Sequence, residues 1–183
     1  MDTGKLIVIS GPSGVGKGTL VKKLLKADES FALSISSTTR TKREGEVHGR
    51  EYYFLSREEF ENKIKNNQFA EYAEYAGNYY GTDYTVIKSM LSLGRNLILE
   101  IDVQGAMQIK EKFPNAKLIF ILPPNLAELK KRLTNRHTEN EETIKLRLAQ
   151  VDREISKSNS FDVKIVNDDI ELATLAILEA VYS

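Results

Sequence analysis

The sequence predicts an α/β fold built on a parallel β-sheet. Short apolar runs typical of buried strands alternate with segments whose apolar residues recur at helical spacing. The first apolar run is followed by a glycine-rich turn and then by a helical pattern, which is the order found in phosphate-binding loops. Because strands that alternate with helices are typical of parallel sheets, these observations favour an α/β architecture.

The predicted elements of the first third begin with a buried strand over residues 5–10, which read KLIVIS. A helix follows over residues 17–27, because four apolar side chains recur there at helical spacing. Residues 31–37 are predicted to form a second strand. The polar stretch 38–50 contains two glycines and is predicted to be a loop.

In the middle third, Ser56 and Glu59 form a capping box that predicts a helix to about residue 66. An aromatic stretch, 68–76, is predicted to be a strand, with a turn at 77–78. A further helix begins near Tyr84 and ends at Gly94, a glycine placed to terminate it.

The final third continues the alternation of strands and helices. The predicted elements are a strand over 96–101, a helix over 104–113, a strand over 116–122, helices over 125–134 and 138–158, a strand over 161–166 and a helix over 170–182. Residues 34–83 lack this rhythm, so they are expected to form an inserted subdomain. The expected core comprises residues 1–33, 84–123 and 148–183.

Composition narrows the functional classes. The chain has 183 residues, enough for one domain, and 26 basic against 26 acidic side chains argue against a nucleic-acid surface. The absence of cysteine excludes disulfides, iron–sulfur clusters and cysteine-bound zinc. No apolar run approaches 18 residues, so no membrane span is expected. We expect a cytoplasmic protein with no obligatory protein partner.

The strongest motif is a phosphate loop between the first strand and the first helix. Its expected ATP-binding residues are Gly11, Pro12, Ser13, Gly14, Val15, Gly16, Lys17, Gly18 and Thr19. Glycines let backbone N–H groups point inward at phosphate, and the lysine adds a point charge. Gly18 stands where Ser or Thr normally faces Mg²⁺. Since Asn62-Lys63 is the only Asn-Lys pair and lies in NKIK, no NKxD guanine motif is present, which favours ATP and a kinase.

Candidate residues in the inserted segment are ambiguous when taken singly. Arg40 and Arg43 lie three apart in a loop, so both can face one anion, although basic loops are often simply solvated. Glu71 lies in a predicted strand, where it could equally well be one of the side chains on the polar face of that strand. Tyr79 and Tyr80 could be sheet packing.

Taken together, the motifs resemble those of guanylate kinase. GPSGVGKGT, SISSTTRTKREGEVHGREYYF, FAEYAEYAGNYYGT, LILEIDVQG and RLTNRHTENEETIKLRL occur in the family's order from residue 5 to the last helix. The resemblance implies ATP-dependent conversion of GMP to GDP with Mg²⁺, a parallel-sheet core, a GMP-binding insertion over 34–83 and a helical lid over 124–147. Whether dGMP is also used stays open.

The resemblance also implies the residues that bind GMP: Ser36, Arg40, Arg43, Tyr52, Glu71, Tyr80, Thr82, Glu100 and Asp102. Arg40 and Arg43 would hold the monophosphate, and Glu71 would accept hydrogen bonds from the guanine N1–H and 2-amino group. Ser36 and Thr82 would donate to the guanine O6.

On the ATP side the resemblance assigns Arg132 to the phosphates and Asn167 and Asp168 to the adenine. It makes Lys17, Arg43, Arg136 and Arg147 catalytic. Mg²⁺ would be held mainly by ATP oxygens and water, with Asp102 acting through a water.

Three departures and two alternatives stay open. Gly18, Glu100 in place of the frequent Asp, and His137 in place of Gly differ from the family pattern. The alternatives are an inactive guanylate-kinase-like module that binds proteins, and a related small-molecule kinase that acts on another phosphorylated acceptor.

Overall fold

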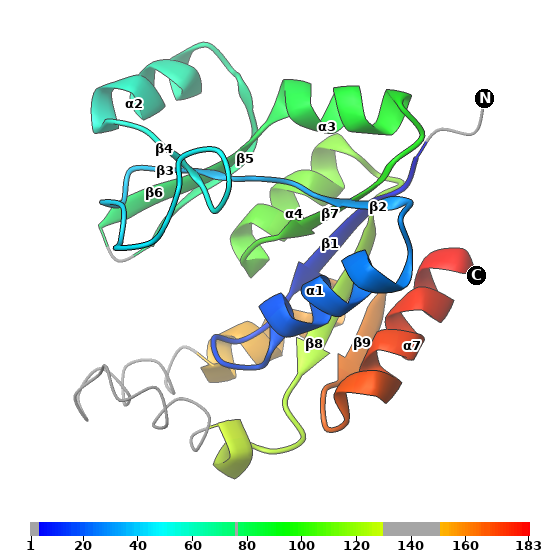
Figure 1. The fold of residues 1–183 in the computed structure, drawn as a ribbon. Helices are drawn as coiled ribbons and strands as arrows, with labels where there is room; N and C mark the ends of the chain where they lie inside the picture. The colour runs from blue at the N-terminus through cyan, green and yellow to red at the C-terminus, as the bar shows by residue number, and fades with distance from the viewer. Residues whose placement is uncertain (1–3, 76, 130–150) are drawn as a thin grey trace.

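A five-stranded parallel sheet forms the centre of the computed structural model, which describes residues 4–75, 77–129 and 151–183 (Figure 1). Its strands, in spatial order, are β2 (Phe31–Leu33), β7 (Asn96–Glu100), β1 (Leu6–Ser10), β8 (Lys117–Leu122) and β9 (Val163–Val166). Every neighbouring pair is parallel, and β1 is buried along its whole length. The predicted α/β class is therefore confirmed.

Helices cover both faces of this sheet because its strands are apolar on both sides. On one face, Ile7 and Ile9 pack in a cluster with side chains of α1 (Lys17–Ala27) and α7 (Ile170–Tyr182). On the other face, Leu6 and Val8 pack with α3 (Tyr84–Ser92) and α4 (Val103–Lys112). The alternation along β1 follows the two-residue period of a strand. None of the described helices is long and apolar enough to cross a membrane.

A second sheet lies beside the carboxyl end of the first (Figure 1). Its order is β4 (Tyr53–Phe54), β3 (Ser37–Thr38), β6 (Asn78–Asp83) and β5 (Phe69–Tyr75), with β6 antiparallel to β3 and β5. Helix α2 (Arg57–Lys65) covers it, and the Phe60 ring stacks on Phe69 and Tyr79 at centroid distances of 4.3 and 5.2 Å. Both hydrogen bonds of the predicted capping box at Ser56 and Glu59 are present.

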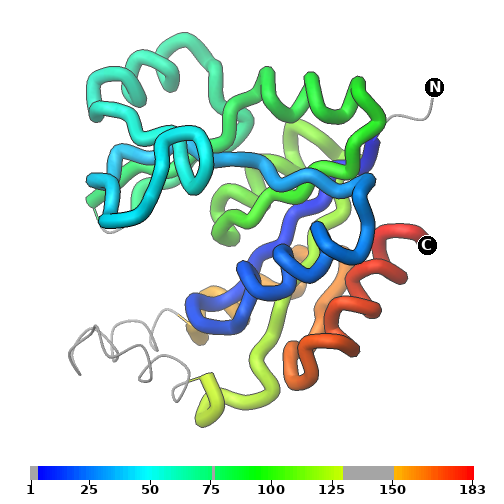
Figure 2. The backbone as a smooth tube through the Cα atoms, viewed as in Figure 1, coloured from blue at the N-terminus to red at the C-terminus, as the bar shows by residue number. Residues whose placement is uncertain are grey.

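The single strand predicted over residues 31–37 was wrong. Residues 31–33 pair with β7 in the central sheet, and Ser34 extends this pairing by donating from N to Ile98 O. By Ser36 the chain has crossed to the second sheet, where its carbonyl accepts from Tyr53 N (Figure 2). One extended segment thus belongs to two sheets, because its hydrogen-bonding neighbours change along its length.

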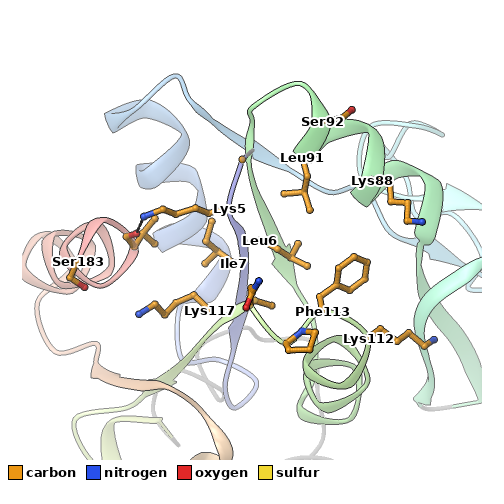
Figure 3. Close-up of a pocket in the computed structure, with 15 residues that line it drawn as sticks. Lys5, Leu6, Ile7, Lys88, Leu91, Ser92, Lys112, Phe113, Lys117 and Ser183 are labelled. Carbon is orange, nitrogen blue, oxygen red and sulfur yellow. Dashed lines mark hydrogen bonds between the residues drawn. The ribbon is translucent and has the colours of Figure 1, made fainter. Parts of the chain in front are cut away.

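An apolar pocket of about 870 Å³ lies at the opposite edge of the central sheet, where β1 and β8 begin (Figure 3). Leu6, Leu91 and Phe113 line it, and the Lys112 ammonium points away from it. None of the predicted nucleotide-binding residues that the structure describes lines this pocket.

Candidate active site

A cleft of about 370 Å³ lies between the carboxyl edge of the central sheet and the second sheet. Residues from both sheets and from the segments and helices beside them line it: Gly11, Ser13, Lys17, Ser36, Tyr52, Glu71, Ala73, Tyr75, Tyr80, Gly81, Glu100, Ile101, Asp102, Gln104 and Glu154. The structure therefore brings the phosphate loop and eight of the nine expected GMP-side positions to one region, but Thr82, Arg40 and Arg43 do not line the cleft itself.

The eight connected positions are joined by contacts as well as by the cleft. Six of them line it: Ser36, Tyr52, Glu71, Tyr80, Glu100 and Asp102. Thr82 joins the group through a hydrogen bond to Glu71, and Arg40 joins it by lying over the Tyr52 ring. The ninth position, Arg43, has an exposed side chain on the loop before β4.

The phosphate loop connects β1 to α1, and its glycines are required by backbone geometry. Gly11 has φ of 144°, and a Cβ there would lie 2.4 Å from the Ile121 carbonyl oxygen. Gly14 and Gly16 have φ of 83° and 98°, values that side-chain-bearing residues rarely adopt. The loop therefore turns tightly between β1 and α1, which is the type of turn in which backbone N–H groups can bind an anion.

Asn167 supports this loop from the end of β9. Its Nδ2 donates to the Val15 carbonyl oxygen at 2.7 Å, and the side chain is almost fully buried. Asp168 is exposed, and the adjacent Asp169 caps α7. Of the two residues expected at the adenine, Asn167 lies against the loop backbone and Asp168 is exposed. Neither lines the cleft.

The Lys17 ammonium lies over the loop, where it donates to Gly11 O at 2.6 Å and Pro12 O at 3.1 Å. Two carboxyl groups, Glu100 and Glu154, line the cleft nearby. Partial removal from water raises the pKa of both carboxyls, and the charge of Lys17 partly offsets this. A Cβ at Gly18 would lie 3.7 Å from Glu100 Oε2, so Glu100 faces the first turn of α1. Thr19 is exposed.

Glu71 and Thr82 form a buried pair on the opposite wall. They are directly opposed in the ladder of β5 and β6, and Thr82 Oγ1 donates to Glu71 Oε1 at 2.5 Å. Their exposed fractions are 3% and 0%. Burial raises the pKa of Glu71 to about 7, Asp102 adds to this, and the Thr82 hydrogen bonds and Lys112 oppose it.

Helix α4 begins beside this pair. Asp102 is its N-cap and accepts from Gly105 N at 2.8 Å. A Cβ on Gly105 would lie 2.5 Å from Glu71 Oε2, so only glycine leaves the carboxylate its present place. Two carboxyl groups from different elements therefore meet at one end of the cleft.

A carboxylate that the sequence reasoning missed, Glu46, pairs with the basic side chain of Arg40 beside the cleft. Arg40 pairs with Glu46 at 2.8 Å, and Glu46 also accepts from Arg43 N at 2.8 Å. The Arg40 guanidinium lies 5.4 Å from the centre of the Tyr52 ring, and burial raises the pKa of that phenol. Glu46 stands three and six residues from the two arginines, which is the signal that would have indicated it. Glu154 had no such signal, because it lies on a polar helix face far along the chain.

Arg132, Arg136, Arg147 and His137 lie outside the described residues. Among the described residues, the cleft offers one wall suited to phosphates and another suited to a planar base with adjacent N–H donors. The first has the glycine-rich loop and the Lys17 ammonium, and the second has the buried Glu71 carboxyl.

The comparisons with known proteins identify one family. The family model described as guanylate kinase matches residues 3–183. The chain is 49% identical to "Guanylate kinase" of Prochlorococcus marinus (strain MIT 9312), over 98% of this chain and 97% of that protein. It is 50% identical to "Guanylate kinase" of Thermosynechococcus vestitus, over 98% and 94%.

Among solved structures, guanylate kinase from Anaplasma phagocytophilum matches with a TM-score of 0.81 and 35% identity, over 99% of this chain and 86% of that one. A shikimate kinase from Bacteroides thetaiotaomicron matches with a TM-score of 0.54 at 12% identity and shows a shared fold alone.

Proposed function

The chain belongs to the guanylate kinase family and phosphorylates GMP with ATP, and we propose that the cleft between its two sheets is where this transfer occurs. One observation carries the proposal. A buried carboxyl that can read a base and a phosphate loop that can hold a triphosphate line the same cavity. The resemblance seen in the motifs is confirmed at the level of the family.

On the GMP wall, Glu71 reads guanine. An ionised carboxylate has only acceptors, and guanine presents N1–H and the 2-amino group side by side. Adenine presents a bare N1 there, which would leave buried groups unpaired. Ser36 and Asp102 line the same space. The Thr82 hydroxyl, which was expected at the guanine O6, donates to Glu71 Oε1 instead, and Thr82 is fully buried.

Arg40, Arg43, Tyr52 and Tyr80 hold the GMP phosphate in this proposal. The Arg40 fork suits a phosphate bidentately, and the two phenols can add O–H donors. Because Glu46 pairs with Arg40, the incoming phosphate competes with this carboxylate for the guanidinium. Tyr52 and Tyr80 pack edge to face with ring centroids 6.0 Å apart, which holds the two phenols side by side.

On the ATP wall, residues 11–19 hold the phosphates through backbone N–H groups and Lys17. The Lys17 ammonium leaves the Gly11 and Pro12 carbonyls for the β- and γ-phosphates. Asn167 holds the loop in shape, and Arg132 belongs to the same wall by resemblance. A role of Asn167 and Asp168 at the adenine stays part of the proposal.

Residues at the cleft fit a magnesium ion that keeps most of its waters. Mg²⁺ prefers oxygen ligands and usually binds through one or two carboxylates and substrate phosphates. No cluster of three metal-ligating side chains occurs within residues 4–75, 77–129 and 151–183, so ATP oxygens would supply most ligands. Glu100, which faces Gly18, and Asp102 would hold the waters of the ion. When bound, Mg²⁺ neutralises charge on the transferring phosphoryl group.

The reaction is an in-line phosphoryl transfer. An oxygen of the GMP phosphate bonds to the γ-phosphorus of ATP as the bond to the β–γ bridging oxygen breaks, which gives GDP and ADP. The attacking phosphate is already anionic, so no general base is needed, and catalysis depends on positioning and charge stabilisation. Lys17, Arg43, Arg136 and Arg147 supply the positive charge.

We also propose a separate role for each part of the chain. Residues 34–83 bind GMP, residues 124–147 form a lid, and the rest form the core. We propose that the protein works in the cytoplasm, where both nucleotides are available, without nucleic acid, membrane or an obligatory protein partner. No observation on the described residues favours the protein-binding module or a kinase for another acceptor.

The test is a coupled assay of ADP release against a panel of nucleoside monophosphates that includes GMP, dGMP, AMP and IMP. We expect GMP to be preferred over AMP, and Glu71→Gln to reduce kcat/KM for GMP roughly 10–150-fold, as expected for loss of a charged hydrogen bond. The control is Glu74→Gln on the same strand, because Glu74 is exposed. A Glu71→Gln protein that discriminates bases like the parent would remove Glu71 from base recognition.

A further inference from the structure

One face of helix α4 packs along strand β5. Gly105, Gln108 and Lys112 lie three and four residues apart, so they share that face. Each of them contacts a residue between Phe69 and Tyr72. We call these three residues and the stretch Phe69–Tyr72 the α4–β5 seam.

Gln108 makes two hydrogen bonds with the Tyr72 backbone, as a neighbouring strand would. Its Oε1 accepts from Tyr72 N at 3.1 Å, and its Nε2 donates to Tyr72 O at 2.8 Å. β5 is an edge strand of the second sheet, so its outer backbone groups have no strand partner. A core helix therefore hydrogen-bonds the outer edge of the strand that carries Glu71, at the residue after it.

Lys112 holds the strand two residues earlier. Its ammonium donates to Ala70 O at 2.7 Å and to Phe69 O at 3.3 Å. Figure 3 shows the Lys112 side chain running along the rim of the apolar pocket with its nitrogen pointing outward. The ammonium therefore binds backbone carbonyls of β5 and does not point into the pocket.

The ladder between β5 and β6 is irregular at this point. Phe69 pairs with Asp83 and Glu71 with Thr82, so the register shifts at Ala70. A bulge residue is left without a ladder partner and changes the direction of nearby side chains. The carbonyl that Lys112 binds belongs to this residue. Strand β6 alone does not define the backbone before Glu71, and α4 supplies the missing contacts.

Gly105 completes the seam from the side of the carboxylate. Because a Cβ at this position would lie only 2.5 Å from Glu71 Oε2, α4 limits where the carboxylate can lie. The backbone on both sides of Glu71 and one of its carboxylate oxygens therefore depend on the same helix.

We propose that α4 positions the base reader: Gln108 and Lys112 set the place of the Glu71 carboxylate through the backbone of Tyr72 and Ala70, and thereby the preference for guanine over adenine. This rests on the proposed function, in which Glu71 reads guanine. Gln108 and Lys112 are positioning residues, because they reach the nucleotide only through the strand.

The experiment measures kcat and KM for GMP, AMP and ATP in Gln108→Leu and Lys112→Met. Each change removes two hydrogen bonds with little change in side-chain length. We expect KM for GMP to rise roughly five- to thirtyfold, since net contributions of single hydrogen bonds are modest. The preference for GMP over AMP should fall by a similar factor, while kcat and KM for ATP stay within about twofold. Lys112→Arg should restore KM for GMP, because a guanidinium can donate to the same carbonyls.

The matched control is Lys110→Met on the same helix. The Lys110 ammonium binds Ala116 O and Asp162, away from β5. If Lys110→Met raises KM for GMP as much as Lys112→Met, or if KM for ATP rises equally with that for GMP, a positioning role is overturned. Unchanged KM for GMP in Gln108→Leu overturns it as well.

A double variant separates this proposal from the proposed function. If the seam acts through Glu71, Gln108→Leu should have little further effect on KM for GMP when added to Glu71→Gln. If the effects of Gln108→Leu and Glu71→Gln on KM for GMP were fully additive, the positioning role of the α4–β5 seam would be overturned. Parent-like base preference in Glu71→Gln alone would instead contradict the proposed function. Loss of base preference in Glu71→Gln, with parent-like Gln108→Leu and Lys112→Met, contradicts only the positioning role. Should Lys112→Met fail to fold, Gln108→Leu decides the question alone.

Discussion

The two walls of the cleft are built in different ways. The phosphate wall is a continuous run, residues 11–19, whose geometry comes from backbone conformation and three glycines with positive φ. The base wall is assembled from Glu71 on β5, Thr82 on β6 and the start of α4. The wall proposed to hold the ATP phosphates is therefore local in sequence, whereas the wall proposed to read the base depends on contacts between distant segments.

Two glycines show the same contrast. A Cβ at Gly11 would lie 2.4 Å from a backbone carbonyl, and a Cβ at Gly105 would lie 2.5 Å from the end of the Glu71 side chain. Backbone within a central sheet cannot move aside, but a carboxylate can rotate. A substitution in the phosphate wall should therefore lower the stability of the fold. A substitution in the base wall should first lower the specificity for guanine.

The largest effect is expected from a residue that resemblance assigns to neither wall. Arg136→Ala should reduce kcat by roughly 10³–10⁵-fold, because arginines that meet the transferring phosphoryl group contribute on this scale. GMP affinity should barely change. Arg136→Lys should recover little, since a point charge does not reproduce the planar fork. Turnover kinetics and equilibrium GMP binding, measured beside Arg43→Ala, check this. Near-parent turnover, or GMP binding weakened as much as kcat, contradicts it.

Alanine at the two glycines tests the contrast directly. Gly11→Ala should lower the free energy of unfolding by about 2–4 kcal/mol, because it combines positive-φ strain with a backbone clash. Gly105→Ala should change it by less than about 1 kcal/mol, since alanine favours the helix while the Glu71 carboxylate moves. Its KM for GMP should rise instead. Urea unfolding and kinetics of both variants are the measurement, and equal destabilisation would show that the walls do not differ.

A third test uses the pKa of Glu71, which is about 7 in the ligand-free protein. If Glu71 reads guanine as proposed, binding needs the ionised carboxylate, so GMP binding should release a proton and weaken about tenfold per pH unit below pH 7. The GMP phosphate also titrates near pH 6. Glu71→Gln carries the phosphate contribution alone, so the difference between the two pH profiles isolates the carboxyl. Parallel profiles would contradict the assignment.

The same carboxyl makes stability depend on pH. Its pKa is raised on folding, so between pH 4.5 and about 7 the folded protein keeps a proton that the unfolded chain has released. The free energy of unfolding should therefore fall by about 3 kcal/mol as pH rises through this window, and Glu71→Gln should lack that part of the slope.

The smallest effect is expected on the phosphate wall, at Gly18. A Cβ there would lie 3.7–3.8 Å from the Glu100 oxygens, which is ordinary contact, and Gly18 lies in the first turn of α1. Gly18→Ser should raise the free energy of unfolding by about 0.5 kcal/mol through helix propensity and leave kcat within about twofold. Thermal unfolding and a Mg²⁺ titration of activity check this. A large loss of activity would show that the space beside Glu100 is needed by the metal and its waters.

Sequence reasoning succeeded where neighbours along the chain define the structure. Helices α1 and α7 begin and end at the predicted residues, and the capping box at Ser56 predicted the start of α2. Gly94, with φ of 72°, terminates α3 as expected. The phosphate loop was identified for the same reason, because glycine spacing, a lysine and a following helix are consecutive.

It was weaker where pairing is set by distant segments. β6 was not predicted, because NYYGTD contains turn-forming residues and becomes a strand only against β5 and β3. Glu71 was indicated by resemblance, while its burial and its contact with α4 could not be seen. Gln108 and Lys112 gave no signal, since a glutamine and a lysine on a helix are ordinarily solvated.

The hydrogen bond from Asn167 to Val15 has a consequence for synthesis on the ribosome. Val15 lies in the phosphate loop, and the side chain that contacts it is made 152 residues later. β9, which brings Asn167 into place, is also the last strand of the central sheet. A nascent chain that carries the complete phosphate motif therefore still lacks the Asn167 contact to Val15 until β9 and the residue after it have been made.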